Sequence, residues 1–552
     1  MVRHGRIREQ SLYPAIKKIF KEHGASSVQE VKLNTAPDLI VDWLGERWIV
    51  SVKIGDPSQP RLLKSAFVQY ISHMRDSGTD YGMIIFYPEA IRKIEPSEEV
   101  IEKAIRSEIA YLIVLNPQIE LRKTLHDALT EISDILRRKI TVTFSLGTVI
   151  KLLREHIEEL MEKVGLTESQ VMKIVSNPEL FFGINPVKEE RKERVLRKAS
   201  RFLASYIFLS QVLFLRLYSE ERPVFMNAID ISRIGRDSAR ELFDKIRDIN
   251  YRPIFEFDVL DAIPEKLIRE TFKLMFGLQV RNIRHELPGR LFHELMPKEV
   301  RKILAAFYTR PVAAYLLALL TIEDPDKTCF DPACGSGTIL AAAYRRKLEL
   351  WKEKGREGNP HKLFCEKQIY GCDIMPFAVH LTNANLAAMD PLMTIDLTQI
   401  ALDDSLKLTT GKSIEPGFVT LADYGIFTGG RGGAQANVFT RTGETVRITL
   451  HPVDVVLMNP PFTKVERGIG RYIRMDKFGQ IVGREVGLWG HFVALAGTFL
   501  KDGGLFGAVL PINLLRGRES ERVRSIIFRR WLPLYIITVS YTHLTLPTTE
   551  RV

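Results

Sequence analysis

Hydrophobic and polar positions in the first 117 residues of this 552-residue chain change from a helical period to a strand period. Residues 8–24 predict an amphipathic helix, and Val28–Leu33 alternates as a strand does. Two further strand-like stretches flank a turn at Leu44-Gly45-Glu46. A helix containing Gln69-Tyr70 follows. The region then ends in apolar strands. The strand-like stretches are Pro37–Trp43, Arg47–Lys53, Tyr81–Tyr87 and Ile109–Val114. We therefore predict a small α/β domain over residues 1–117.

Residues 118–300 have a helical period almost throughout. The predicted helices are Leu121–Arg138, Val149–Val164, Arg191–Leu217, Arg236–Asp248 and Pro264–Leu278. The basic start of the third helix is typical of a solvated helix face, and contact with DNA is the alternative. We predict a helical connector domain here and assign it no functional residue.

Short apolar runs return in residues 301–539, and each one ends in residues that can carry chemistry. Thr328-Cys329-Phe330 leads into Asp331-Pro332-Ala333-Cys334-Gly335-Ser336-Gly337, and a helical stretch begins at Thr338. Glycines between a strand and a helix let the backbone approach a cofactor without a Cβ in the way. Position 340 is Leu, so the third glycine of a dinucleotide fingerprint is missing, which argues against NAD or FAD.

Two acidic positions follow this glycine loop. The strand Ile369–Ile374 contains Asp373 near its end, where a carboxylate can accept both hydroxyls of an adenosine ribose. The alternative for Asp373 is a helix N-cap before Ala378–Met389. Asp404, next to Ser405, can accept a bond from an adenine amino group; the alternative is a solvated loop acid.

The run Val453–Met458 delivers Asn459-Pro460-Pro461-Phe462. The Asn459 side-chain oxygen and the Pro460 carbonyl can bind the two hydrogens of a planar exocyclic amine and localise its lone pair. Proline suits this position because its ring fixes φ and removes an N–H donor. Phe462 can stack on a base rotated out of its helix. The alternative is a turn with a surface aromatic residue.

In this order the motifs resemble the N6-adenine DNA methyltransferases. Phe307-Tyr308-Thr309-Arg310-Pro311 is similar to the Phe-Tyr-Thr-Pro element of that family, with Arg310 inserted, and Leu500–Pro511 and Leu515–Glu521 are similar to its later elements. The resemblance implies a Rossmann-like domain over 301–539, S-adenosylmethionine as cofactor, and DNA adenine N6 as acceptor. It implies catalytic roles for Asn459, Pro460, Pro461 and Phe462. The implied cofactor residues are Tyr308, Thr309, Asp331, Pro332, Cys334, Gly335, Gly337, Asp373, Ile374, Asp404 and Ser405.

The N-terminal domain resembles the restriction-endonuclease-like fold, in which two carboxylates hold Mg²⁺ near a lysine. Asp38 and Lys53 match that pattern as a metal ligand and its partner lysine. Ser51 stands where a second acid is expected, and a single acid binds Mg²⁺ weakly. A migrated acid at Glu9, Glu30 or Glu46 is the alternative, as is a purely structural role for Asp38 and Lys53. Mg²⁺ is expected only if this domain cleaves DNA.

Composition agrees with an anionic partner, because the formal net charge is +11. The four cysteines are Cys329, Cys334, Cys365 and Cys372, and they contain no Cys-x-x-Cys pair, which argues against a zinc site or a disulfide framework. The most apolar stretch, Ala204–Leu217, contains Ser, Gln and Arg, so we expect no membrane span and a cytoplasmic protein.

Together, these regions resemble a single-chain type IIG restriction–modification enzyme acting on double-stranded DNA. The alternative is a modification subunit that works with a specificity or restriction subunit and has an inactive nuclease-like domain. A non-catalytic nucleic-acid-binding scaffold and other amine acceptors (RNA, cytosine N4, protein glutamine) also stay open. Residues 540–552 look like a translated adapter tail, which leads us to expect that the natural protein continues into a target-recognition domain.

Overall fold

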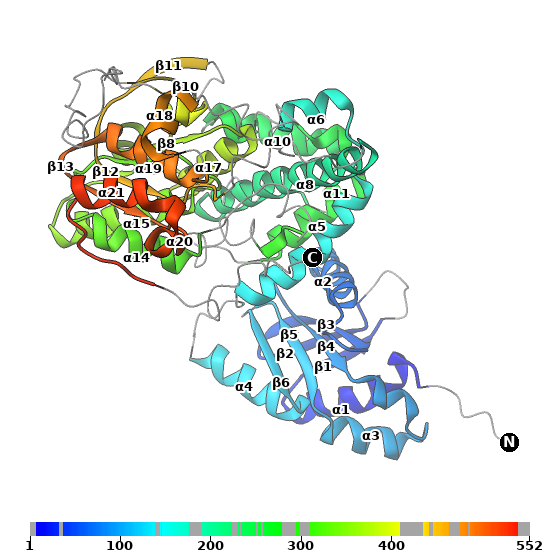
Figure 1. Ribbon diagram of the computed structural model, residues 1–552. Coiled ribbons are helices and arrows are strands. Elements are labelled where there is room, and N and C mark those ends of the chain that lie inside the picture. The colour runs from blue at the N-terminus through cyan, green and yellow to red at the C-terminus, as the bar shows by residue number, and fades with distance from the viewer. Residues whose placement is uncertain are drawn as a thin grey trace. The chain divides into compact units, whose positions relative to one another are not determined.

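The computed structural model describes most of the chain, and its contacts divide the chain into two compact units. Unit 1 comprises Met1–Thr167, Ser200–Ile249 and Phe257–Met296; unit 2 comprises Glu168–Ala199, Asn250–Glu256 and Pro297–Val552 (Figure 1). Tyr308, Gly429–Gly433 and residues 540–552 lie outside the described residues. The described residues are 7–31, 37–116, 118–138, 144, 146–175, 189–222, 230–231, 233–249, 252–255, 258–278, 294–297, 309–408, 434–440, 445–462, 475–483 and 486–538.

Unit 1 contains a six-stranded sheet in the order β1-β2-β3-β4-β5-β6. Only β3 and β4 run parallel, and the other neighbours are antiparallel. Leu44 and Gly45 both have positive φ, which gives the β2–β3 hairpin a turn whose twist matches its strands. The strands are β1 (Ser27–Glu30), β2 (Leu39–Trp43), β3 (Glu46–Ile54), β4 (Tyr81–Tyr87), β5 (Ala110–Val114) and β6 (Ile119–Lys123).

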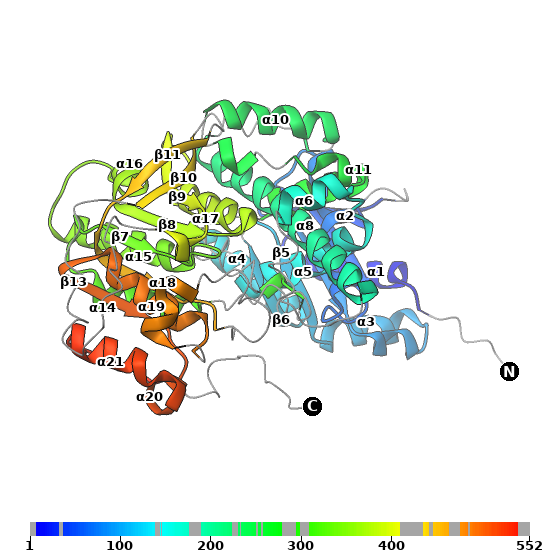
Figure 2. The same cartoon turned by 45° about the horizontal axis from the view of Figure 1, so that its top comes forward.

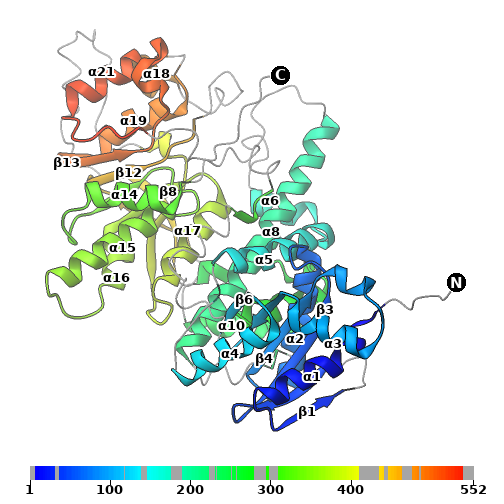
Figure 3. The same cartoon turned by 90° about the horizontal axis from the view of Figure 1, so that it is seen from below.

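Helices cover both faces of this sheet, so its central strands are buried on both sides. The apolar sides of α1 (Tyr13–Glu22), α3 (Glu98–Ser107) and α4 (Leu125–Arg137) pack on one face in a single core. Helix α2 (Pro60–Asp76) contacts β3 and β4 and is backed by α5 (Leu146–Lys163) (Figure 3). The predicted order of helix, hairpin, helix and strands is therefore observed.

Two more helices complete the helical part of unit 1, α10 (Arg236–Ile249) and α11 (Glu265–Phe276). They gather with the part of α8 (Glu189–Glu221) that follows residue 199, as Figure 2 shows. Phe243 of α10 stacks on Phe272 of α11 and meets Phe208 of α8 edge-on. Within the described residues, Leu196–Glu220 is the one helix long and apolar enough to cross a membrane, and its most apolar 18-residue window is buried throughout, as in the core of a globular domain.

The predicted boundary at residue 117 does not separate the two units. Residues predicted as the start of a helix at Leu121 instead form β6, which pairs with β5, and α4 begins only at Leu125. Thr124 ends the strand because its side chain caps α4. The first sheet and part of the predicted connector thus belong to one unit.

Unit 2 contains a seven-stranded sheet in the order β11-β10-β9-β8-β7-β12-β13. The five strands from β9 to β13 in this order run parallel, and the β10–β11 hairpin adds antiparallel strands at the β9 edge. This confirms the predicted α/β class. The strands are β7 (Cys329–Asp331), β8 (Ile369–Asp373), β9 (Leu397–Leu402), β10 (Ala434–Thr440), β11 (Thr445–Leu450), β12 (Val453–Met458) and β13 (Leu500–Ala508).

Alternate residues of β12 enter two different cores. Val455 and Leu457 pack with α14 (Pro311–Thr321) and α15 (Thr338–Glu353). Val456 and Met458 pack with the helices of the other face. The helices of that face are α18 (Met475–Val482), α19 (Leu488–Phe499) and α21 (Glu521–Arg530). Helix α17 (Pro376–Ala388) contacts α15. Unit 2 also contains α6 (Glu168–Val175), α16 (His361–Leu363) and α20 (Asn513–Arg516).

Two features of unit 2 were not predicted. No element was predicted for the segment before β12, and it contains the β10–β11 hairpin. Residues 532–538, inside the predicted domain of residues 301–539, form neither helix nor strand and pair with no strand of the described chain. Their apolar side chains are exposed, as in Leu532 and Tyr535.

Candidate functional site

The carboxyl ends of three parallel strands bring the predicted motifs to one edge of the unit 2 sheet. Asp331 ends β7, Asp373 ends β8, and Asn459 follows β12. Strand β7 lies between β8 and β12. The chain therefore reverses its direction of sheet growth beside β7, and in open α/β sheets this switch point is where ligands bind.

The loop after β7 is shaped by two glycines with positive φ. Gly337 (φ 75°) caps α15, and a Cβ there would approach Thr382 to within 3.0 Å. Gly335 (φ 55°) differs, because the nearest atom to a Cβ there would be the Ala333 carbonyl oxygen at 3.9 Å. The space beside Gly335 is thus open to a ligand, whereas Gly337 packs against α17.

Side chains of α17 and of the loop after β9 hold this glycine loop from outside. Thr382 donates to the Gly335 carbonyl at 3.0 Å, and Asn385 donates to the Ser336 carbonyl. Ser405 donates to the Pro332 carbonyl at 2.6 Å. Ser405 therefore supports the loop through its hydroxyl, a role that the sequence did not predict.

The buried part of the loop is kept neutral. Asp331 is 1% exposed, and burial raises its pKa to about 8, with the charge of Asp373 acting in the same direction. Its Oδ1 accepts from the Ala333 N–H at 3.0 Å. Burial also raises the pKa of the Cys334 thiol, so it stays protonated at neutral pH. Pro332 is buried beside them.

Asp373 connects the end of β8 to the glycine loop. Its Oδ2 accepts from the Gly335 N–H at 3.0 Å and its Oδ1 from the Met375 N–H at 2.9 Å. Burial raises its pKa to about 6, although backbone hydrogen bonds oppose this effect. It does not cap α17, whose N-cap is Met375 and has no side-chain cap bond. The next residue, Ile374, is half-buried.

Asp404 has the local contacts of a structural acid. Its side chain accepts from the Leu406 N–H at 3.2 Å as the N-cap of a short 3-10 helix (Ser405–Lys407), and its Oδ2 lies 3.0 Å from the Lys407 ammonium. The predicted adenine contact at Asp404 stays a prediction.

The Asn459–Phe462 motif begins one residue after β12. Pro460 is buried, and Phe462 packs partly buried against the core shared with α18, α19 and α21. Asn459 donates from Nδ2 to Thr309 Oγ1 at 2.9 Å. Thr309 is 8% exposed and lies two residues before α14. The structure thus brings together two residues that lie 150 positions apart.

Residues 297–532 match the family model described as N-6 DNA Methylase. This region therefore matches an N-6 DNA methylase domain, and the match covers less than half of the chain. The matched range contains Thr309, the glycine loop, Asp373 and the Asn459–Phe462 motif, so the predicted recognition is confirmed at the level of the domain. None of the curated proteins compared with the chain matches it.

Several solved structures are similar to the chain at low identity. The type IIG restriction endonuclease BpuSI shares 15% identity at a TM-score of 0.36, over 94% of this chain and 52% of that one. The type I methyltransferase subunit from Streptococcus thermophilus shares 15% at a TM-score of 0.36, over 70% and 79%. The DrdV–DNA complex shares 13% at 0.37, over 92% and 48%. The chain spans about half the length of BpuSI, and likeness at this level assigns no role to its residues.

A second cluster of candidate residues lies in unit 1, where β3 extends beyond its pairing with β2. Asp38 Oδ2 accepts from the Val52 N–H at 2.6 Å, and Glu9 Oε1 accepts from the Ile54 N–H at 3.2 Å. N–H groups two residues apart on a strand point to the same edge, roughly 7 Å apart. Two carboxylates therefore border the same strand edge, and Lys53 Nζ lies 3.9 Å from Asp38.

The structure places the three acids that the sequence left open differently. Glu46 begins β3 at the distal turn of the hairpin. Glu9 accepts from the Ile54 N–H on the edge of β3 that Asp38 borders, and Glu30, which pairs with Lys17 at 3.0 Å, lies in register with Leu39, the neighbour of Asp38. Ser51 is buried. Tyr13 donates to Asp38 Oδ1 at 2.6 Å, and burial together with this bond raises the pKa of Tyr13.

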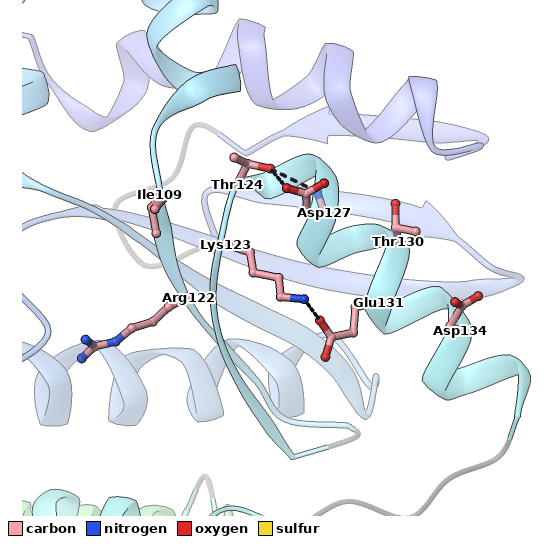
Figure 4. Close-up of a pocket in the computed structure, with 8 residues that line it drawn as sticks. All are labelled: Ile109, Arg122, Lys123, Thr124, Asp127, Thr130, Glu131 and Asp134. Carbon is pink, nitrogen blue, oxygen red and sulfur yellow. Dashed lines mark hydrogen bonds and ion pairs between the residues drawn. The ribbon is translucent and has the colours of Figure 1, made fainter.

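Two other groups of polar residues in unit 1 are paired internally. His156, Glu159 and Glu270 lie close enough to share a metal ion, but the Lys64 ammonium pairs with both carboxylates. A surface recess beside α4 contains the Lys123–Glu131 ion pair at 2.6 Å, together with the Thr124–Asp127 bond (Figure 4). The recess is also lined by Ile109, Arg122, Thr130 and Asp134. In both groups a lysine ammonium therefore already neutralises a carboxylate, Lys64 in the first and Lys123 in the second.

Proposed function

We propose that this chain transfers a methyl group from S-adenosylmethionine to the N6 amine of adenine in double-stranded DNA. The observation that carries the proposal is the position of Asn459 and Pro460 after β12, next to the strand that carries the glycine loop. The family match over the same residues supports it. In this proposal the protein works in the cytoplasm, where its DNA substrate lies.

The described residues fit the cofactor. Open space beside Gly335 accommodates a ligand against the backbone, and Asp373 presents a carboxylate at the end of the adjacent strand. We assign Asp373 to the ribose hydroxyls, Gly335 and Gly337 to the loop that shapes the pocket, and Ile374 to its apolar lining. When bound, S-adenosylmethionine supplies an electrophilic methyl group.

The residues of the chain then have to hold and activate a weak nucleophile. The adenine amine conjugates its lone pair into the ring. Asn459 Oδ1 and the Pro460 carbonyl, both acceptors, bind its two hydrogens and turn the lone pair toward the methyl donor. The Pro460 and Pro461 rings keep this loop rigid, and Phe462 packs against the extruded base. The neutral amine attacks the methyl carbon as the bond between that carbon and sulfur breaks. The methylated amine then loses its extra proton to solvent, so the rate comes from positioning.

Methyl transfer to unmethylated genomic DNA tests this proposal. The full chain is incubated with tritiated S-adenosylmethionine, beside Asn459→Ala, and the product nucleosides are separated. We expect N6-methyladenine from the wild type and a loss of about 10²-fold or more in the variant, with cofactor binding retained. Cofactor binding without methyl transfer to DNA would instead favour a non-catalytic nucleic-acid-binding scaffold. A product of N4-methylcytosine would show that the acceptor is cytosine and not adenine.

A second candidate activity, Mg²⁺-dependent cleavage of DNA, is favoured by the convergence of Asp38 and Glu9 on one strand edge. Two carboxylates improve the fit to a hard divalent cation over a single acid. Asp38 and Glu9 would hold the ion, which supplies an activated water and charge neutralisation at the phosphate. Lys53 would stand beside them. This would make the chain a type IIG-like enzyme with its own nuclease.

The two activities are separable by substitution. Asp38→Asn and Glu9→Gln should abolish Mg²⁺-dependent cleavage and leave methyl transfer intact. Asn459→Ala should do the reverse. If wild-type protein methylates DNA but never cleaves it, the chain is better explained as a modification subunit that relies on a separate specificity or restriction subunit.

A further inference from the structure

The segment after β13 leaves the sheet at the edge that carries the Asn459 motif. Strands β12 and β13 run parallel with Met458 in register with Ala508, and the Val509 N–H donates to the Met458 carbonyl at 3.0 Å. The end of β13 therefore lies beside the residue that precedes Asn459. Helix α20 begins at Asn513, and a chain of four residues spans at most about 14 Å. The segment thus stays close to the proposed site of the target base.

This segment and the helix that follows it are strongly basic. Residues 513–530 contain six arginines and two glutamates, with no lysine or aspartate, so positive charge is in excess. Arg516 ends α20, and Arg518 begins a short 3-10 helix (Arg518–Ser520). Both arginines are exposed, and neither forms an ion pair with a described residue. Their charges are therefore available to a partner in solution.

The backbone that carries the two exposed arginines is held from α21. Arg524 Nη1 donates to the Leu514 carbonyl at 2.8 Å and to the Gly517 carbonyl at 2.6 Å. The Gly517 N–H donates to the Asn513 carbonyl at 2.7 Å, and a Cβ at Gly517 would lie 2.8 Å from that oxygen. The turn is therefore closed before any partner binds, which reduces the ordering that binding would cost.

Unpaired guanidinium groups beside a site for an extruded base fit the phosphates of DNA. A guanidinium presents a planar fork of N–H donors that matches phosphate oxygens. The grooves of B-DNA are about 6 and 12 Å wide, so phosphates of both strands lie within a comparable distance of an extruded base. Contacts to phosphates hold a duplex in register without reading its sequence.

We propose that Arg516 and Arg518 bind DNA phosphates beside the adenine that is extruded toward Asn459. The two arginines hold the duplex over the site and add no sequence preference of their own. This inference rests on the proposed function, because it takes DNA as the substrate.

The test measures how binding of DNA to the full chain depends on salt. A fluorescein-labelled, unmethylated duplex of about 30 base pairs is titrated between about 50 and 200 mM KCl. Arg516→Gln and Arg518→Gln should each weaken binding about fivefold at the lower concentration. Each should also make the slope of log K against log salt shallower by about 0.9, because one phosphate contact fewer releases fewer counterions. Arg516→Lys and Arg518→Lys keep the charge and should keep most of the slope. All four variants should bind S-adenosylmethionine with the wild-type Kd.

Lys352→Gln is the matched control. Lys352 is exposed near the end of α15, and Lys354 beside it pairs with Asp324, which precedes β7. Lys352 therefore lies at the amino edge of the sheet, opposite to the site. Removal of its charge should leave the slope unchanged.

An unchanged slope in both glutamine variants would overturn the inference and would favour a protein partner for this surface, where Ile512 and Leu515 are also exposed. An equal change of slope in Lys352→Gln would overturn it as well, because the effect would then come from net charge alone. A wild type that binds the duplex with the expected slope but transfers no methyl group would overturn the proposed function and leave the phosphate contacts standing.

Discussion

The Asp373 carboxylate and the Gly335 backbone N–H are joined by a hydrogen bond of 3.0 Å between the ends of two neighbouring strands. Asp373 ends β8, and Gly335 lies in the loop after β7. The acid that we assign to the ribose therefore also holds the loop against which the cofactor would lie. Loop shape and ligand contact are coupled through one carboxylate, whose pKa is raised to about 6 by burial.

Cofactor binding should weaken in acid because of Asp373. A carboxylate accepts two ribose hydroxyls better than a carboxylic acid does. With a pKa of about 6, roughly a tenth of the free protein is in the binding form at pH 5, so the Kd should rise about tenfold between pH 7.5 and 5. Equilibrium binding across this range measures it. Asp373→Asn should bind weakly at all pH values, and the same acid dependence in that variant would assign it to another group.

The Asp373 carboxylate gives folding the opposite pH dependence to that of cofactor binding. Its pKa is higher in the folded protein than its ordinary value of 3.8. Folding therefore favours the protonated form, and the contribution of Asp373 to stability falls as pH rises from about 4 to 6 and stays low above that. Bound cofactor should offset this loss, so the thermal stabilisation by S-adenosylmethionine should be greater at pH 7.5 than at pH 5.

Changing each of the two loop glycines to alanine should affect a different property, stability for Gly337 and cofactor affinity for Gly335. Both have positive φ, which costs a non-glycine residue about 1–2 kcal/mol. At Gly337 a Cβ also meets Thr382, so Gly337→Ala should lower the unfolding free energy by about 2 kcal/mol or more. At Gly335 the Cβ would enter open space, so Gly335→Ala should lose less stability and more cofactor affinity. Chemical denaturation and cofactor titration of both variants distinguish these losses.

The sequence predicted those parts of the site that are local in the chain. The glycine loop, Asp373 and the Asn459 motif each follow an apolar run, and parallel strands bring such ends to one edge whatever their separation. The Thr309–Asn459 bond joins residues 150 positions apart, and no local pattern encodes it. Glu9 was one of three candidates for the second metal-binding acid, and only the structure shows that it accepts from the Ile54 N–H. Strand β6 was predicted as helix because five residues are too few to distinguish the two periods.

Lys64 is the buried cation on which the junction of α2, α5 and α11 depends. It is 5% exposed and pairs with Glu159 and with Glu270 at 2.9 Å. Lys64→Met keeps most of the side-chain volume but leaves two carboxylates without their cation, which should cost about 3 kcal/mol of unfolding free energy at pH 7. Adding Glu159→Gln and Glu270→Gln to Lys64→Met should recover part of this loss.

The pH dependence of the Lys64→Met loss follows from Glu159. Burial would raise the pKa of Glu159, but the bond and charge of Lys64, with help from Lys163, outweigh burial and lower it. Because the pKa of Glu159 is lower in the folded protein than its ordinary value of 4.5, Glu159 stabilises the fold at pH values above 4.5. This contribution is lost as the pH falls through the pKa of the folded protein. The stability difference between wild type and Lys64→Met should therefore shrink below about pH 4.5. A constant difference would attribute the loss to packing alone.

Mg²⁺ should stabilise unit 1 if Asp38 and Glu9 form a cation site, whether or not DNA is cut. The two carboxylates border one strand edge, and a bound ion would remove their mutual repulsion. For a Kd of about 1 mM, 10 mM Mg²⁺ should contribute ~1.4 kcal/mol, or roughly 3–6 °C in the unfolding transition of unit 1. Asp38→Asn and Glu9→Gln should each lose the shift, while Glu46→Gln, at the distal turn of the hairpin, should keep it. An equal shift in all four proteins would place the ion elsewhere. Asp38 and Glu9 would then serve only to accept from the N–H groups of Val52 and Ile54.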